Sequence, residues 1–112
     1  MCNLQCDLME ETGGLVLKLA GQITFSEMDE FEKQLARVSA RKPARLVLDL
    51  TDLTMITSAG IGALLKLHRR AVEQKCDLRL AALQHDIEDV FRKARLDSIF
   101  SIVPTLNDAL VN

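Results

Sequence analysis

The pattern of hydrophobic and polar positions changes character in the middle of the chain, where a strand gives way to an amphipathic helix. Residues 46–50 form an apolar run with the length and branching of a strand buried on both faces. Polar residues 51–54 follow, and small residues at 57–60 precede apolar positions at helical spacing. The predicted helix runs from about Ser58 to Gln74. Ser58 is therefore expected at a helix N-terminus, where unpaired backbone N–H groups carry a partial positive charge.

The rest of the chain alternates between the same two periods. Short apolar or alternating segments predict strands over residues 3–9, 15–20, 77–82 and 99–103, the first two joined through a turn at residues 10–14. Helical spacing predicts a helix from an N-cap at Ser26 to Lys42, a second over 86–95 and a short last one capped by Thr105. The order β-β-α-β-α-β-α-β-α predicts one α/β domain over residues 1–112. Its mixed, mostly parallel sheet carries four helices stacked largely on one face.

Composition and charge narrow the class of protein. The 112 residues have a net charge of −2 and no Trp or Tyr, which argues against a nucleic-acid binder with a basic face and stacking aromatics. No apolar stretch approaches the ~20 residues of a membrane span, and the first residues do not resemble a signal peptide. Cys2, Cys6 and Cys76 make no disulfide framework and are expected as buried or edge thiols. We expect a cytoplasmic protein without membrane insertion.

Residues suited to catalysis are sparse. A serine nucleophile needs a base within hydrogen-bond reach, but His68 lies roughly 15 Å beyond Ser58 along the predicted helix and fits a half-buried rim position. His85 fits the entry turn of the next helix. Gly60 and Gly62 lack the third glycine and the acid of a dinucleotide site, and two N-terminal thiols alone make a poor zinc site. We expect no catalytic residue, no cofactor and no metal.

Two polar residues near the centre of the chain have alternative interpretations. Ser58 is either an N-cap, a role that serine favours, or a regulatory hydroxyl to which a phosphate could be attached in a favourable field. The spacing does not choose between these roles. Asp49 interrupts the apolar strand near its C-terminal end, the edge where open α/β sheets place their sites. An ordering role for Asp49 is favoured over direct contact with a partner.

Residues 46–65, LVLDLTDLTMITSAGIGALL, resemble the central motif of STAS domains, specifically that of the small bacterial anti-sigma factor antagonists. That motif is an apolar strand ending in L-D-L-[ST], a short loop, then D-S-S-G or S-S-A-G before an apolar helix start. Gly21-Gln22-Ile23 resembles the G-x-[LI] that follows the family's second strand, and residues 100–110 resemble its closing strand and helix. The likeness extends over nearly the whole chain, and the central motif is its specific part.

The resemblance implies a switch protein without catalytic activity. In this family the serine at the position of Ser58 is phosphorylated by an anti-sigma factor that is itself a serine kinase, and a serine phosphatase reverses the modification. The unmodified form binds the kinase and so releases a sigma factor or another client. Here Thr57 replaces the acid that often precedes the serine, and Ala59 replaces a competing second serine. Ser58 is thus the sharper candidate for phosphorylation.

The resemblance also implies a partner surface on a monomer or weak dimer. It comprises a loop over 21–26, a loop over 49–58 and the start of the second long helix. The predicted partner-binding residues are Gly21, Gln22, Thr24, Asp49, Thr51, Asp52, Thr57, Ser58, Ala59 and Gly60.

Two other functions remain as alternatives at this point. STAS domains also serve as cytosolic subunits of lipid-transporting ABC systems, in which T-[AS]-x-G-type motifs occur, and Thr57 keeps that alternative open. A small α/β hydrolase is the other alternative, but no base is placed for Ser58.

Overall fold

The computed structural model describes residues 3–111, so Cys2 lies outside the described residues. Five strands form one sheet in the order β1-β2-β3-β4-β5, and β1 pairs antiparallel with β2 while the other neighbours are parallel. The bounds are β1 Leu4–Glu11, β2 Gly14–Ile23, β3 Arg45–Ile56, β4 Asp77–Ala81 and β5 Ser101–Val103. The predicted mixed, mostly parallel sheet with an N-terminal hairpin is confirmed.

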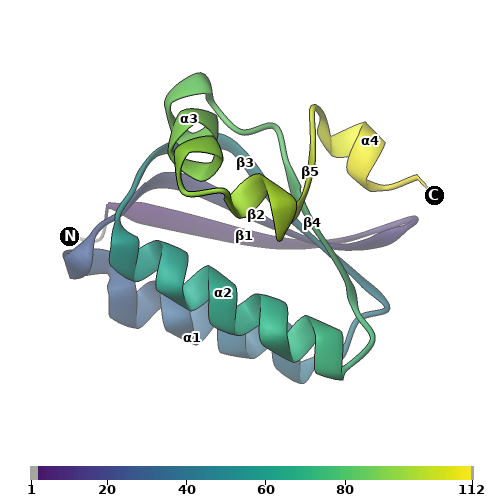
Figure 1. Cartoon of the computed structure of the whole chain (residues 1–112). Coiled ribbons are helices and arrows are strands. Elements are labelled where there is room, and N and C mark those ends of the chain that lie inside the picture. The colour runs from purple at the N-terminus through teal and green to yellow at the C-terminus, as the bar shows by residue number, and fades with distance from the viewer. Residues whose placement is uncertain (1–2, 112) are drawn as a thin grey trace.

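The helices cover the sheet unequally. α1 (Met28–Ala40) and α2 (Ser58–Glu73) lie side by side on one face, and α4 (Leu106–Ala109) lies on the other (Figure 1). α3 (His85–Lys93) joins the same core as α1 and α2 through Ile87 and Phe91. Three helices therefore follow the expectation of one covered face. The short α4 does not, because Ala109 packs against the opposite face of the sheet.

Alternation along the strands explains the two faces. Alternate leucines of β2, β3 and β4 point into the main core with Phe31, Leu35 and Leu64 from the helices. The residues between them, Val16 and Val47 among them, point toward α4. The ring of Phe100 contacts Phe91 and lies 5.6 Å from the ring of His68. His68 is half-buried, as predicted for a residue at the rim of the core.

The central strand is longer than predicted. β3 continues to Ile56, and β2 continues to Ile23, so the loops expected over 49–58 and 21–26 are wrong for residues 49–56 and 21–23. Two register shifts between β2 and β3 keep the strands paired across these polar residues. In β3, Leu53 and Ile56 are buried three residues apart rather than two. This spacing hides the strand from a search for period two.

The start of the first helix also differs from the prediction. Ser26 is not an N-cap: it lies inside a 3₁₀ turn, Phe25–Glu27, and α1 begins after it. The turn is held by Glu27, whose carboxylate accepts hydrogen bonds from the backbone N–H and the hydroxyl of Thr24. The other predicted cap is confirmed, because the hydroxyl of Thr105 accepts the N–H of Asp108 at the start of α4.

Candidate functional site

The ends of β2 and β3 and the start of α2 meet at one end of the molecule. Gly21, Gln22 and Ile23 pair with Leu53, Met55 and Ile56. The carbonyl of Ile23 accepts both the N–H and the hydroxyl of Thr57, at 3.0 and 3.3 Å. These contacts bring the predicted residues of the second strand next to the predicted serine, and we call this end of the molecule the Ser58 pole.

Ser58 is exposed and is the first residue of α2. Thr57 holds the N-cap position in extended backbone conformation. The first amide that bonds back within the helix is that of Ile61, which donates to the carbonyl of Thr57. The amides of residues 58–60 have no acceptor within the helix. The first turn of α2 carries no acidic side chain. The arrangement presents a free hydroxyl to solvent at the positive end of a helix of 16 residues.

Two glycines at the Ser58 pole are required by close packing. Gly21 has a φ of +105°, and a Cβ built on it would lie 2.0 Å from the carbonyl oxygen of Asn3. A Cβ on Gly60 would lie 2.8 Å from side-chain carbons of both Ile23 and Ile56. Both residues fix the backbone that positions Ser58, and Gly60 itself is buried.

Asp49 is turned inward. Its side chain is 6% exposed and accepts the N–H and the hydroxyl of Thr51 at 3.1 and 2.6 Å. The carbonyl of Thr51 in turn accepts the side-chain amide of Gln84, at the N-cap position of α3. This geometry matches the ordering role for Asp49 and joins the middle of β3 to α3. Asp52 is exposed and pairs with Lys18 at 3.3 Å.

Two exposed apolar side chains near Ser58 were not predicted from the sequence. Phe25, in the 3₁₀ turn, is 88% exposed, and Met55, three residues before Ser58, is 49% exposed. A phenylalanine inside the polar segment 24–27 was the available signal. An open groove of about 470 Å³ is lined by Phe25, by residues 28–32 of α1 and by residues 59–66 of α2.

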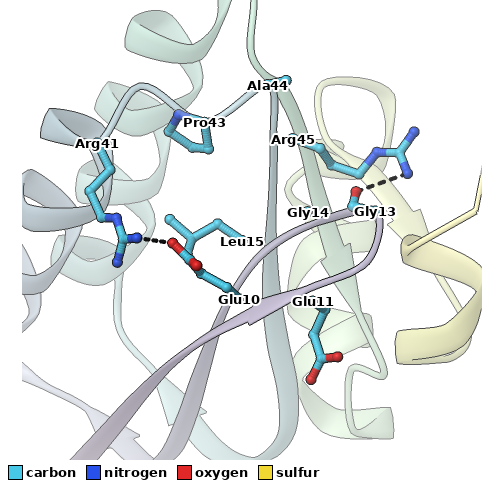
Figure 2. Close-up of a pocket in the computed structure, with 9 residues that line it drawn as sticks. All are labelled: Glu10, Glu11, Gly13, Gly14, Leu15, Arg41, Pro43, Ala44 and Arg45. Atoms are coloured by element: carbon cyan, nitrogen blue, oxygen red, sulfur yellow. Dashed lines mark hydrogen bonds and ion pairs between the residues drawn. The ribbon is translucent and has the colours of Figure 1, made fainter.

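A second hollow, of about 360 Å³, lies at the opposite end of the strands, beside the β1–β2 hairpin (Figure 2). Three of its four charged side chains are bonded to neighbours in the described chain, and Glu11 is the exception. Arg41 pairs with Glu10, and Arg45 donates to the carbonyl of Gly13 and to Asp77 at 3.2 Å. Among the described residues, no group of three or more His, Cys, Asp or Glu side chains could hold a metal ion. Because Glu10, Arg41 and Arg45 bond to neighbouring residues, we interpret this hollow as a structural part of the fold.

Within residues 3–111, no helix has both the length and the apolar character needed to cross a membrane.

Comparison with known proteins places these features in a family. The profile of the STAS domain matches residues 6–109. BtrV of Bordetella bronchiseptica, provisionally named an anti-sigma factor antagonist, is 29% identical over 90 residues, which cover 80% of this chain and 78% of BtrV.

Solved structures share the fold at lower identity. An anti-sigma factor antagonist from Mycobacterium paratuberculosis superposes with a TM-score of 0.88 at 23% identity, covering 96% of this chain and 91% of its own. The phosphorylated form of the Bacillus cell fate determinant SpoIIAA superposes with a TM-score of 0.68 at 16% identity, covering 95% of each chain.

Proposed function

Because this chain belongs to the STAS domain family, we propose that it is an anti-sigma factor antagonist that switches partners through phosphorylation of Ser58. The unmodified form binds an anti-sigma factor with serine-kinase activity and releases that factor's client. The observation that carries the proposal is the geometry of Ser58, an exposed hydroxyl that opens a helix whose first turn contains no acidic residue.

The physics of the switch follows from that position. A phosphate adds roughly −1.5 to −2 charges and three acceptor oxygens. In the free protein the N-terminus of α2 favours an anion. In a packed interface the same charge loses its water and meets the groups of the partner, which can cost several kcal/mol. Since about 1.4 kcal/mol is tenfold in affinity, one phosphate can weaken the complex by two or more orders of magnitude without a change of fold.

The relatives support this function. BtrV carries the name of an anti-sigma factor antagonist, and SpoIIAA has been solved in a phosphorylated form. The alternative of a subunit of a lipid-transporting ABC system has no comparable support among these relatives.

We propose that the predicted partner-binding residues have two different roles in the contact surface. Gln22, Thr24, Thr51, Asp52 and Ala59 face the partner around Ser58. Four other residues hold the surface from within: Gly21, Asp49, Thr57 and Gly60. Asp49 and Gly60 are buried, Thr57 bonds to the carbonyl of Ile23, and the backbone of Gly21 lies too close to Asn3 to carry a side chain.

Other proteins carry out the enzymatic steps of the proposed cycle. A serine phosphatase restores the hydroxyl of Ser58, and the chain itself performs no catalysis and works in the cytoplasm.

The test uses each purified serine-kinase anti-sigma factor of the source organism. With ADP present, calorimetry should give a tight complex with the wild type and with Ser58→Ala, and one weakened at least about 100-fold with Ser58→Asp. With ATP, mass spectrometry should find the phosphate on Ser58. Ser101→Asp is the matched control, since Ser101 is also exposed but lies at the start of β5, outside the proposed contact surface. Phosphate on another residue, or equal affinity of Ser58→Ala and Ser58→Asp, contradicts the proposal.

A further inference from the structure

Two glycines near the start of α2 have different relations to the fold. Gly60 is packed against Ile23 and Ile56, whereas a Cβ added at Gly62 would meet no atom within 4 Å. Gly62 is exposed inside a helix, where glycine is less favourable than alanine because it loses more backbone freedom. The described structure therefore gives no steric reason for a glycine at position 62, although the residue lowers the stability of α2.

Gly62 lies in the open groove beside Ser58. Ala59 and Gly62 of α2 line one side of this groove, and Phe25 also lines it. The groove has a volume of about 470 Å³. Phe25 is 88% exposed, whereas Phe31, Phe91 and Phe100 are all buried. An aromatic side chain left in water next to a smooth helix surface is typical of a residue that is buried on association.

The charges along this groove are unpaired. Asp29 and Glu32 lie on its α1 side and Lys66 on its α2 side. None of the three forms an ion pair within residues 3–111. At the opposite end of the sheet, by contrast, Glu10 and Asp77 each pair with arginine. The groove therefore offers an apolar floor between an acidic rim and a basic rim.

From these observations we propose that the groove receives an amphipathic helix of the kinase partner. The helix approaches most closely at Gly62, covers the ring of Phe25 and sets basic side chains against Asp29 and Glu32. A helix in an apolar groove is a recurring mode of recognition in which apolar anchors enter the floor and charges meet the rims. The proposal rests on the proposed function, because a partner that covers Ser58 also covers Ala59 at the mouth of this groove.

The first test is steric. Gly62→Gln fills the groove with a good helix former, so the midpoint of thermal unfolding should stay equal or rise while the Kd for the purified kinase with ADP rises at least 30-fold. Val72→Gln is the matched control, because Val72 is also exposed on α2 but lies nearly three turns further along. Its Kd should stay within twofold of wild type.

Two further variants test the apolar end and the acidic rim. Phe25→Ser should weaken binding at least tenfold without lowering the unfolding midpoint, and Val72→Ser should not. Glu32→Lys should weaken binding at least tenfold, with a larger effect at low salt. Its control is Glu11→Lys, an exposed acid at the other end of β1.

The outcomes separate this proposal from the proposed function. If Gly62→Gln and Phe25→Ser bind the kinase as wild type does while Ser58→Asp is excluded, the groove proposal is overturned and the switch stands. If wild type binds no kinase, both the groove proposal and the proposed function are overturned. A photocrosslinking p-benzoylphenylalanine in place of Phe25 should label kinase residues on one face of a helix. Labelling of a loop, or of a second copy of this chain, would overturn the proposal.

Discussion

At the scale of single residues, the Ser58 pole depends on one buried carboxylate. Glu27 is 2% exposed, and its oxygen accepts the N–H and the hydroxyl of Thr24 at 2.8 and 2.6 Å. These charge-assisted bonds close the turn between β2 and α1. Phe25 lies inside this turn, and the carbonyl of Ile23 just before it receives Thr57. The carboxylate of Glu27 thus supports both sides of the proposed contact surface.

We expect Glu27→Ala to lower the free energy of unfolding by about 1–3 kcal/mol. The variant loses two hydrogen bonds to a carboxylate, and the N–H and hydroxyl of Thr24 lose their acceptor. Urea unfolding followed by circular dichroism measures the change. Glu32→Ala, at an exposed position of the following helix α1, should change stability by less than about 0.5 kcal/mol. A Glu27→Ala protein as stable as wild type would show that the turn does not depend on this carboxylate.

At the scale of elements, the two sides of Ser58 differ in how far the sequence predicts them. Helix α2 was predicted from about Ser58 to Gln74 and runs from Ser58 to Glu73, since its apolar positions recur at helical spacing. The second half of β3 was missed because Thr51, Asp52 and Thr54 are exposed on an open part of the sheet. Pairing across a register shift is a tertiary property that no local pattern carries.

The candidate site likewise has features that the sequence predicts and one feature that it does not. A hydroxyl at a helix start and an inward carboxylate such as Asp49 follow from position along the chain. The groove that joins Phe25 to Gly62 requires two helices to lie side by side, so local spacing does not predict it.

The short helix α4 is held to the sheet by a cluster of charges. Arg79 donates to Asp77 at 2.9 Å and to the carbonyls of Ala109 and Val111 at 3.3 and 2.5 Å. Asp77 also accepts Arg45. The hydrogen bond from Arg79 is the main reason that the pKa of Asp77 lies below its ordinary value, although partial burial opposes the shift. Asp77 therefore fixes the arginine that holds the last residues of the described chain.

A lowered folded-state pKa makes this contribution depend on pH. The stabilisation from Asp77 is fully present above the unfolded pKa of about 4 and is lost as pH falls through the lower folded pKa. We expect wild type to be more stable than Asp77→Asn at pH 7, by less than about 1 kcal/mol because the side chain is partly exposed. Urea unfolding from pH 7 to 2 should find the difference shrinking below pH 4. A difference that persists unchanged at pH 2 would contradict this account.

At the scale of the whole molecule, the two ends of the sheet are built differently. At the hairpin end most charged side chains are bonded, as Arg41 is to Glu10 (Figure 2). The Ser58 pole exposes the ring of Phe25, and its groove is lined by the charges of Asp29, Glu32 and Lys66. It also exposes a helix N-terminus without an acid. A phosphate added there acts on the docked complex rather than on the fold. This separation makes stability and binding respond to the same charge in opposite directions.

That separation gives the last prediction. Ser58→Asp should raise the free energy of unfolding by about 0.3–1 kcal/mol at low salt, because an exposed negative charge in the first turn of α2 interacts favourably with the helix dipole. Ser58→Lys should lower it by a similar amount, and 1 M salt should remove most of both effects by screening. The measurement is urea unfolding at two salt concentrations, beside calorimetry with the kinase. If Ser58→Asp lost binding and stability together, the negative charge would act by loosening α2 in the free protein, and a switch confined to the interface would be wrong.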